Sequence, residues 1–400
     1  MRTLLVSQYF PPEPGATQNR LGTFARGLVE RGHEVTVVCE QPCHPAGVFQ
    51  AGYGRRPLVT AVEDGMTVHR LWVATSPSKT TSRRLAFYAT FAAGAASAVS
   101  LLARRHDVVY ASSPPLPGVL TVAAAARAAR RPYVADVRDI WPAAAQALGE
   151  LSNPRLIGAF ERAERALYRH ASAVTTTTRP FCSHIDAVAG VRRSVHLPNG
   201  ALDSLVALPD RPPPRNERFT IGYAGNHGIA QGLGIVLDAA ERLDGEARFV
   251  LLGDGPVKAE LQARDTAGRI EFRPGVPVES VADFLLSCDA LLIPLRDHPL
   301  LDDFIPSKLY DAMAVGRPAL VATRGEAAQL VHEAGAGLAV APENGDALAT
   351  AVRRLIAAPD EAAAMARRGR AAARDLARSR QVERLDVLLR TVARGADPLQ

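Results

Sequence analysis

Short apolar runs alternate along the chain with longer stretches whose apolar residues recur at helical spacing. In the first half, this pattern predicts strands at 3–9, 34–39, 66–73, 107–113, 132–139 and 172–178, and helices at 19–31, 83–105, 117–130 and 154–169. The predicted strands are apolar on both faces, and helices separate them. This arrangement is typical of a doubly wound parallel sheet that helices cover on both sides.

Three consecutive prolines interrupt this rhythm near the middle of the chain. They exclude a central strand or helix, so we predict an interdomain linker at 198–217. The alternation then resumes, with strands predicted at 219–225, 248–254, 269–275, 289–295, 318–323 and 336–342, and helices at 344–358, 360–376 and 379–394. We therefore predict two Rossmann-like α/β domains facing across a cleft, at 1–197 and 218–378, with the C-terminal helix at 379–400 packing back toward the first.

The composition supports a large folded core. Of the 400 residues, 47% are hydrophobic and 22% are charged, which are ordinary values for a globular chain. The net charge of +6 favours an anionic partner, although the many arginines and alanines leave a purely compositional origin open. The cysteines are scattered. Only Cys39 and Cys43-His44 lie close together and no second pair completes a zinc site, so we expect reduced cytoplasmic thiols.

An uncharged stretch at 85–103 is long enough to span a bilayer. It is rich in small residues, and arginines flank both of its ends, so no charge asymmetry sets a direction across a membrane. We expect a buried helix with a basic entrance at Lys79, Arg83 and Arg84. The 79–105 region leaves open a peripheral contact with an anionic membrane. The N-terminus lacks the pattern of a signal peptide, which favours a cytoplasmic protein, peripheral on the inner membrane face if that contact forms.

In the first domain, polar residues gather where two predicted strands end, which is where open α/β sheets bind ligands. The loop after the first strand has Gly15 in place of a G-x-G-x-x-G motif, and this glycine lets the backbone approach an anion. The strand at 132–139 ends in Asp136, Arg138 and Asp139, with Trp141 close behind. This set suits a hydroxyl-bearing or anionic acceptor. A proline-rich surface loop and a structural Asp–Arg pair beside a buried tryptophan are the alternatives.

In the second domain, glycines mark the ends of successive strands. They stand at 222, 225, 228 and 232, at 253 and 255, and at 275. Loops of this kind can bring backbone N–H groups to a phosphate. One such loop is a weak signal, since glycines also serve tight turns, but several in one domain jointly favour a nucleotide-binding site.

The segment 302–318, DDFIPSKLYDAMAVGRP, places charges at the start of a predicted helix. A helix that begins near Pro306 offers unpaired N–H groups and a partial positive charge to an anion, and Lys308 adds a full charge. Asp303 and Asp311 can accept hydrogen bonds from sugar and ribose hydroxyls. The alternative is a surface helix with a Lys308–Asp311 charge pair.

With these segments in view, the chain resembles a family-4 glycosyltransferase of the GT-B fold. The resemblance covers most of the chain and is carried, in order, by PPEPGATQNRLGTFARGLVERGHEVTVVC, YVADVRDIWP, LPNG, GYAGNHGIAQGL, LLGDGP, FRPGVP and IPSKLYDAMAVGRPAL. Three shorter pieces, RDIWP, GNHGIAQG and SKLYDAMAVG, together resemble the O-antigen fucosamine-transferase-like branch in particular.

The resemblance implies roles for individual residues. It implies donor binding by Gly15, Asn226, Gln231, Arg273, Gly275, Val276, Ser307, Lys308 and Asp311, catalysis by Asp303, Lys308, Arg138 and Asp139, and acceptor binding by Asp136, Arg138, Asp139 and Trp141. Both glutamates of the family's Glu-x7-Glu pattern are aspartates here, at 303 and 311. The family's arginine and lysine after the first donor-domain strand fall near Asn226 and Gln231, and its catalytic-face histidine has no clear equivalent.

The function implied by the resemblance is that of a retaining glycosyltransferase, of the hexosyl- or N-acetylhexosaminyl-transferase type, which needs no metal or other cofactor. It would transfer a sugar from a nucleotide diphosphate sugar, by expectation a UDP-sugar, to a hydroxyl of a glycan, a polyprenyl-linked glycan or a small natural product. A non-hydrolysing UDP-sugar 2-epimerase is the alternative enzyme, and a non-catalytic sugar-nucleotide-binding protein is an alternative of another class. The arginine-rich C-terminal helices would suit nucleic acid, but no recognition motif accompanies them, so no nucleic-acid partner is expected.

Overall fold

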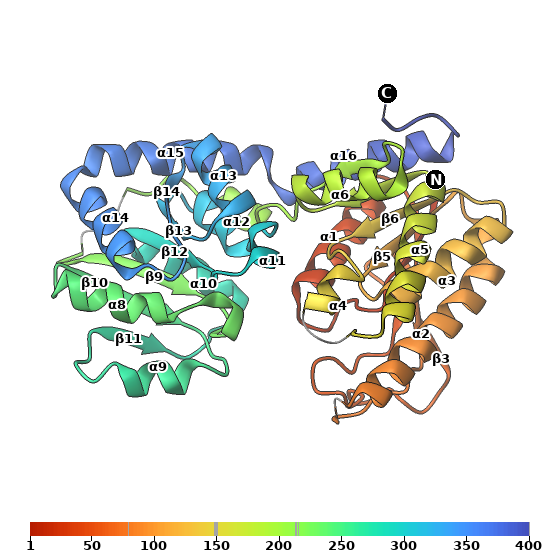
Figure 1. Cartoon of the computed structure of the whole chain (residues 1–400). Coiled ribbons are helices and arrows are strands. Elements are labelled where there is room, and N and C mark those ends of the chain that lie inside the picture. The colour runs from red at the N-terminus through yellow and green to blue at the C-terminus, as the bar shows by residue number, and fades with distance from the viewer. Residues whose placement is uncertain (79, 148–150, 213, 215, 400) are drawn as a thin grey trace. The chain divides into compact units, whose positions relative to one another are not determined.

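The computed structural model describes residues 1–78, 80–147, 151–212, 214 and 216–399. The chain folds into two compact units, which we call unit 1 (Met1–Asn199 and Gln381–Gln400) and unit 2 (Gly200–Arg380). Figure 1 shows the helices and strands of both. Each unit is a mainly parallel sheet with helices on both faces, as the alternation of apolar runs predicts.

The sheet of unit 1 has the strand order β3-β4-β2-β1-β5-β6-β7-β8. Its strands are β1 (Arg2–Val6), β2 (Glu34–Glu40), β3 (Leu58–Glu63), β4 (Met66–Leu71), β5 (Val108–Ser113), β6 (Tyr133–Val137), β7 (Ala173–Thr176) and β8 (Ser194–His196). All neighbours are parallel except β3 and β4, which form an antiparallel pair. The central strands β2, β1, β5, β6 and β7 are buried almost throughout because helices cover both faces, whereas β3 at the edge alternates between exposed and half-buried residues.

The helices of unit 1 include one from the far end of the sequence. They are α1 (Ala16–Glu30), α2 (Thr81–Leu102), the short 3-10 helix η1 (Ala103–Arg105), α3 (Leu116–Ala128), α4 (Ala143–Ala147), α5 (Pro154–His170), α6 (Arg179–Ala189) and α16 (Arg378–Ala393). From Gln381 onward α16 belongs to unit 1. There it buries Val382, Leu385, Leu388, Leu389 and Val392 in the same hydrophobic cluster as residues of β1, β2 and α1.

Helix α2 is less buried than the sequence analysis expects. Its buried residues, Phe91, Ala92, Ala95 and Val99, form one face, while Leu85 is 66% and Leu101 78% exposed. The stretch Thr81–Arg105 is long and apolar enough to cross a membrane by length and composition, with a mean hydropathy of 1.7 and 22% of the apolar window buried. Core helices of water-soluble folds pass the same test. Of the expected basic entrance, Lys79 lies outside the described residues, and the guanidinium of Arg83 donates to Ser76 Oγ at 2.9 Å.

The sheet of unit 2 is wholly parallel, with the strand order β11-β10-β9-β12-β13-β14. Its strands are β9 (Phe219–Ala224), β10 (Ala247–Leu252), β11 (Ile270–Arg273), β12 (Ala290–Pro294), β13 (Ala319–Ala322) and β14 (Gly337–Val340). Its helices are α7 (Asp203–Val206), η2 (Ile229–Gln231), α8 (Gly234–Leu243), α9 (Lys258–Arg264), α10 (Val278–Ser287), α11 (Pro299–Asp302), α12 (Ser307–Ala314), α13 (Gly325–Ala334), α14 (Gly345–Ala357) and α15 (Pro359–Asp375). Two hydrophobic clusters fill the two sides of this sheet.

The segment at 198–217 is only partly a linker, contrary to the sequence-based prediction. Ala201 pairs with Ala377 in an isolated parallel bridge, and Leu205 of α7 is buried in a core cluster of unit 2. Apolar side chains between the proline run and the preceding strand therefore anchor this stretch. The predicted linker residues Pro213 and Arg215 lie outside the described residues.

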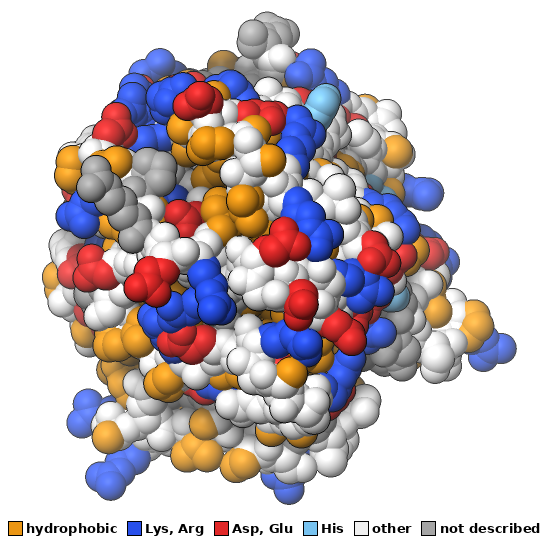
Figure 2. All heavy atoms as spheres, turned by 90° about the vertical axis from the view of Figure 1, so that its left-hand side faces the viewer, with side chains coloured by type: hydrophobic (Ala, Val, Ile, Leu, Met, Phe, Trp, Pro, Cys, Tyr) orange, Lys and Arg blue, Asp and Glu red, His pale blue; other side chains and the backbone are white. Residues whose placement is uncertain are grey.

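Two of the arginines near the C-terminus bind oxygens of the protein itself. The guanidinium of Arg370 is buried, forms an ion pair with Asp210 at 2.6 Å and donates to the carbonyl of Ala314, and Arg368 donates to the carbonyl of Gly335. On the face drawn in Figure 2, basic and acidic side chains are interspersed. Arg368 and Arg370 therefore stabilise the fold locally.

Candidate functional site

Two glycine loops meet at the carboxyl ends of β9 and β10. Gly225 and Gly253 have φ values of 145° and 135°, a region that side-chain-bearing residues rarely adopt. A Cβ atom on Gly253 would lie 2.0 Å from the carbonyl oxygen of Gly225. The loops are also joined by backbone hydrogen bonds, from Gly225 N–H to Leu252 and from His227 N–H to Asp254. Glycine is therefore required at 253 for the loops to pack this closely.

The loop after β11 is tied to the loop after β10. Asp254 accepts a hydrogen bond from the N–H of Gly275 at 2.8 Å and one from Lys258 Nζ at 2.8 Å. Lys258 also donates to the carbonyls of Gly253 and Arg273. All three contacts of this ammonium are with protein oxygens, so Lys258 stabilises the loops.

Lys308 lies in the first turn of α12 and points to the loop after β9. Its Nζ donates to Tyr223 Oη at 2.9 Å and lies 4.3 Å from the centre of the Tyr223 ring. The hydroxyl of Tyr223 donates in turn to the carbonyl of Asn226 at 2.6 Å. Burial lowers the pKa of Lys308 to about 8, with Asp311 opposing the shift. At neutral pH this site therefore contains a cation that has given up most of its hydration.

Asp311 lies one helical turn after Lys308 in a small cavity of about 50 Å³, which the two residues line together with apolar side chains. Burial raises the pKa of Asp311 to about 6, with Arg378 and Lys308 opposing. Its buried Oδ1 has no hydrogen-bond partner among the described residues, and no ion pair joins it to Lys308 there. A buried acceptor without a partner is costly, so the alternative of a surface charge pair does not fit.

The remaining predicted donor residues of unit 2 lie on the same loops. Asn226 follows Gly225, Gln231 ends η2, Gly275 and Val276 follow β11, and Ser307 begins α12. Arg273 ends β11, where its Nε donates to Glu271 at 2.6 Å. Asp303 follows α11, four residues before α12 begins. The structure thus brings these residues to the carboxyl end of one sheet, while their contacts with a ligand stay predictions.

Sequence reasoning missed two residues of this site. Tyr223 ends in a hydroxyl that contacts Lys308, although 85 positions separate them in the chain. His227 is fully buried, with ring centroids 5.7 Å from Tyr223, and its ring nitrogens have no hydrogen-bond partner among the described residues. Burial lowers its pKa, and Lys258 acts in the same direction, so the ring is neutral at pH 7. In the sequence, these two residues appear only as the tyrosine and the histidine of GYAGNHG, and nothing there shows that they lie next to Lys308.

In unit 1, the charged residues after β6 form a buried ion-pair network. Arg20 of α1 donates to Asp136 at 3.1 Å, and Arg138 Nε lies 3.6 Å from the other carboxylate oxygen. Burial alone would raise the pKa of Asp136, but Arg20 and Arg138 outweigh it and hold the pKa below its usual range. Asp136 is fully buried and also accepts from Thr175. Asp136 accepts hydrogen bonds from Arg20 and Thr175, so in this structure it holds the network together, and its predicted contact with the acceptor stays a prediction.

Arg138 and Asp139 remain candidates for contact with a substrate. The side chain of Arg138 is 12% exposed; one of its nitrogens donates to Thr17 Oγ1, and Nη2 has no partner among the described residues. Burial lowers the pKa of Arg138, although Asp136 opposes it, and burial raises the pKa of half-buried Asp139. Trp141 packs edge-on against Phe160, with ring centroids 6.1 Å apart.

Gly15 precedes α1 with a φ of 151°, where a Cβ atom would meet the Gln18 amide at 2.2 Å. Because this residue lies in unit 1, its predicted role in donor binding stays a prediction.

A cavity of about 230 Å³ opens beside this end of the unit 1 sheet. Its walls come from the loops after β1, β2 and β4 and from the start of α2, and include Tyr9, His44, Arg83, Arg84, Phe87 and Tyr88. Two guanidinium groups and several aromatic rings therefore surround one opening. Such a cavity suits a ligand with an anionic group and an apolar or sugar-ring surface.

Two α/β units with mainly parallel sheets, one of which carries glycine loops, a half-buried lysine and an unpartnered carboxylate at its strand ends, are the architecture expected of a GT-B glycosyltransferase. The comparisons agree. Residues 15–200 match the "Glycosyl transferase 4-like domain", and residues 218–358 match "Glycosyl transferases group 1". The chain belongs to the family-4 glycosyltransferases.

Individual relatives extend this match over nearly the whole chain. The chain is 26% identical to the glycosyl transferase WcaI of Escherichia coli K12, whose name assigns it to colanic acid biosynthesis, over 90% of this chain and 93% of WcaI. Among solved structures, Anabaena HepE in complex with UDP has a TM-score of 0.72 and 17% identity, covering 98% of this chain and all of HepE. Sucrose-phosphate synthase of Thermosynechococcus elongatus has a TM-score of 0.72 and 15% identity, covering 99% of this chain and all of that protein.

Proposed function

We propose that this glycosyltransferase is a retaining, metal-independent enzyme that uses a UDP-sugar as its donor. The observation that carries the proposal is the arrangement at the start of α12, where the ammonium of Lys308 lies against Tyr223 and the buried Oδ1 of Asp311 has no partner in the described part of unit 2. A cation and a hydrogen-bond acceptor one helical turn apart fit the diphosphate and the ribose diol of a nucleotide. The structures of HepE with UDP and with UDP-glucose support UDP as the carrier.

In this proposal, charge stabilisation drives the departure of UDP. Lys308 and the free N–H groups at the start of α12 would receive the negative charge that develops on the diphosphate oxygen as the glycosidic bond breaks. Asp303, just before the helix, would accept hydrogen bonds from the transferred sugar, and Asp311 from the ribose. Retention follows from the family resemblance, which implies attack by the acceptor hydroxyl on the face that the leaving group vacates. No covalent protein nucleophile is assigned.

We further propose that the cavity of unit 1 receives the acceptor. Arg83 and Arg84 favour a phosphate or diphosphate group, and the rings of Tyr9, Phe87 and Tyr88 favour a sugar ring or an isoprenoid chain. A polyprenyl diphosphate-linked glycan has both features. The apolar exposed side chains of α2 would then contact the membrane that carries such a lipid. The link of WcaI to colanic acid, by its name, is in keeping with a glycan product.

A donor screen followed by a transfer assay tests the proposal. UDP should raise the unfolding midpoint more than GDP, CDP or inorganic diphosphate at equal concentration; a ligand at 100 times its Kd adds about 2.7 kcal/mol to stability. The UDP-sugar that gives the largest shift is then incubated with acceptor mixtures, with and without EDTA. A product with the donor's anomeric configuration, formed without added Mg²⁺, is expected.

Other outcomes would contradict specific parts of the proposal. Loss of transfer in EDTA and its recovery with Mg²⁺, while the unfolding midpoint stays constant, would refute metal independence. An inverted product would refute retention. Conversion of a UDP-sugar without any acceptor would favour the epimerase, and tight UDP-sugar binding without transfer to any acceptor would favour a non-catalytic binding protein.

A further inference from the structure

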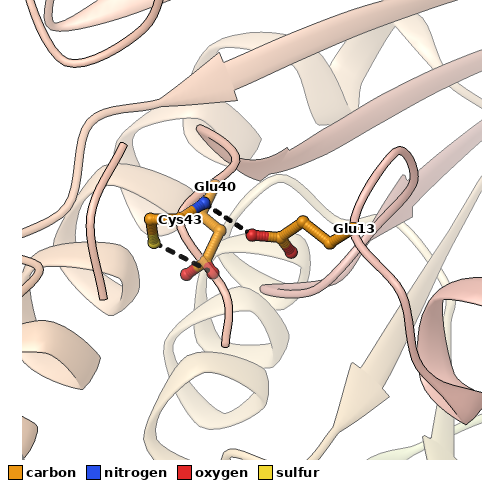
Figure 3. Close-up of side chains that lie close together, drawn as sticks. All are labelled: Glu13, Glu40 and Cys43. Carbon is orange, nitrogen blue, oxygen red and sulfur yellow. Dashed lines mark hydrogen bonds between the residues drawn. The ribbon is translucent and has the colours of Figure 1, made fainter. Parts of the chain in front are cut away.

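Three side chains from separate segments of unit 1 converge beneath the acceptor cavity. Glu13 follows β1, Glu40 ends β2, and Cys43 lies in the loop after β2. One carboxylate oxygen of each glutamate and the Cys43 sulfur all lie within 4.8 Å of one another (Figure 3). Each residue is at most 3% exposed. Glu40 is only three residues from Cys43, but Glu13 is 30 residues away, so the sequence pattern around Cys43 alone did not indicate the cluster.

The hydrogen bonds of the cluster leave several of its oxygens open. Glu13 Oε1 accepts from the N–H groups of Cys43 and His44, both at 2.7 Å, and Cys43 Sγ lies 3.6 Å from Glu40 Oε1. Gln8, which is 1% exposed, donates its amide N–H to Glu40 Oε2 at 2.8 Å. Glu13 Oε2 and Gln8 Oε1 are both buried without a hydrogen-bond partner among the described residues. Two buried acceptors with open lone pairs thus lie beside a thiol and a second carboxylate.

The charge of the cluster is not balanced by the protein. Among the described residues, no lysine or arginine forms an ion pair with either carboxylate. Burial raises the pKa of Glu40 well above its ordinary value, and Glu13 raises it further. Burial also raises the pKa of Glu13, although the N–H donors of the loop, His44 and the neighbouring Gln18 oppose it. Two buried carboxylates in mutual repulsion need a proton or a cation.

We infer that Glu13, Glu40 and Cys43 form a binding site for a divalent transition-metal ion of the zinc class. The ligand atoms indicate which kind of metal ion binds, because Zn²⁺ binds thiolate and carboxylate together, whereas Mg²⁺ and Ca²⁺ prefer oxygen ligands alone. Glu13 Oε2 is the open oxygen of a carboxylate that the loop N–H groups already orient, and Gln8 Oε1 is a further oxygen beside Glu40. Binding would displace the thiol proton of Cys43 to solvent.

The acceptor cavity supplies the route by which an ion reaches this site. Cys43 is part of the cluster and also lines the cavity, as do its neighbours His44 and Tyr9. A bound ion would join the loop after β1 to the loop after β2, and these two loops form part of the cavity wall. The ion is therefore structural: it fixes the cavity wall and takes no part in the transfer step. The inference uses unit 1 alone and does not rest on the proposed function.

Cobalt titration tests the site on the full chain, because Co²⁺ replaces Zn²⁺ in such sites and a cobalt–thiolate bond absorbs in the near ultraviolet. We expect the metal-stripped protein to bind one Co²⁺ with this absorption and to lose it when one equivalent of Zn²⁺ is added. The Cys43→Ser variant should lose the absorption. The matched control is Cys39→Ser, four residues earlier on β2, where a buried thiol lies near Arg70 and outside the cluster; this variant should keep it.

A second variant distinguishes metal binding by the cluster from protonation of its carboxylates. Glu40→Gln keeps the shape of the side chain and imitates a protonated carboxyl group, so the metal site predicts at least tenfold weaker Co²⁺ binding. The inference is overturned if wild-type protein binds neither Co²⁺ nor Zn²⁺, or if the absorption survives in Cys43→Ser. Absence of metal binding together with a higher unfolding midpoint for Glu40→Gln would identify the cluster as a proton-sharing acid pair instead.

The test is independent of the donor chemistry. If the cluster binds metal and EDTA lowers both the unfolding midpoint and the transfer rate, the comparison is repeated with Cys43→Ser, which has no metal to lose. If this variant transfers sugar and neither EDTA nor Mg²⁺ changes its rate, the structural metal site and the metal-independent mechanism are both supported. Transfer by that variant that requires Mg²⁺ contradicts only the metal-independent mechanism.

Discussion

The affinity for UDP should fall as the pH rises from 7 to 9, because only the ammonium form of Lys308 pairs with a diphosphate. Burial lowers the pKa of this lysine to about 8 in the free protein. With that pKa, the charged fraction is about nine-tenths at pH 7 and about one-tenth at pH 9. Provided that bound diphosphate keeps the lysine charged throughout, the apparent Kd rises about tenfold, which corresponds to about 1.4 kcal/mol. The terminal phosphate of UDP ionises near pH 6 and stays charged over this range.

Isothermal titration calorimetry with UDP measures both the affinity and the accompanying proton. At pH 8, about half of the free protein must take up a proton on binding, so the observed enthalpy should depend on the ionisation enthalpy of the buffer with a slope of about one half. Lys308→Arg is the matched control because its guanidinium stays charged, and its Kd should change little between pH 7 and 9. Lys308→Ala should bind UDP about ten- to a hundredfold more weakly at pH 7, and its affinity should not fall further as the pH rises.

Two results would refute this reasoning. If the Kd of the wild-type protein is the same at pH 7 and 9, Lys308 is not the cation that meets the diphosphate. If Lys308→Arg shows the same alkaline loss as the wild type, another group titrates, and the assignment of the pKa near 8 to this lysine is wrong.

Three further predictions follow from the two sites. Asp303→Asn should leave the Kd of UDP unchanged while lowering turnover, since its expected partner is the transferred sugar; equal loss of UDP binding in calorimetry would contradict that division of roles. Asp136→Asn should destabilise unit 1 by about 3–5 kcal/mol in chemical denaturation, because it leaves buried arginines unpaired, whereas Glu246→Gln in an exposed ion pair should leave the midpoint unchanged. Gly253→Ala should abolish UDP binding in calorimetry because its Cβ would clash with the Gly225 carbonyl, and unchanged affinity would show that the loops can move apart.

The sequence predicted the two parallel sheets because each central strand is an uninterrupted apolar run. It missed β3, whose alternating exposed residues face solvent at the sheet edge, and β8, which is only three residues long. It also predicted a buried α2, because uncharged residues were taken to be covered, but only Phe91, Ala92, Ala95 and Val99 of this helix are buried. The apolar pattern shows which residues could be buried. Which of them are buried depends on their distance from the sheet edge and on the helices that pack beside them.

For the candidate sites, the sequence located the loops and missed the contacts across them. Lys308 and Asp311 share one helix turn, so their proximity could be predicted from spacing. The contact of Lys308 with Tyr223 and the convergence of Glu13 with Cys43 depend on strand order, which no local pattern encodes. Asp136 shows the converse case: an acid at a strand end suggested a ligand, and the two arginines that enclose it could not be predicted from the sequence.

Because the chain returns to unit 1 at Gln381, segments of unit 1 flank unit 2 in the sequence. A fragment that ends at Asn199 lacks the five apolar side chains that α16 adds to the core of unit 1, so that unit cannot be completed on the ribosome until the last residues emerge. Proteolysis within 381–393 would damage a domain whose sequence begins at Met1. Recombination between relatives should therefore succeed when residues 200–380 are exchanged as a cassette, and fail when the chains are joined once in the middle.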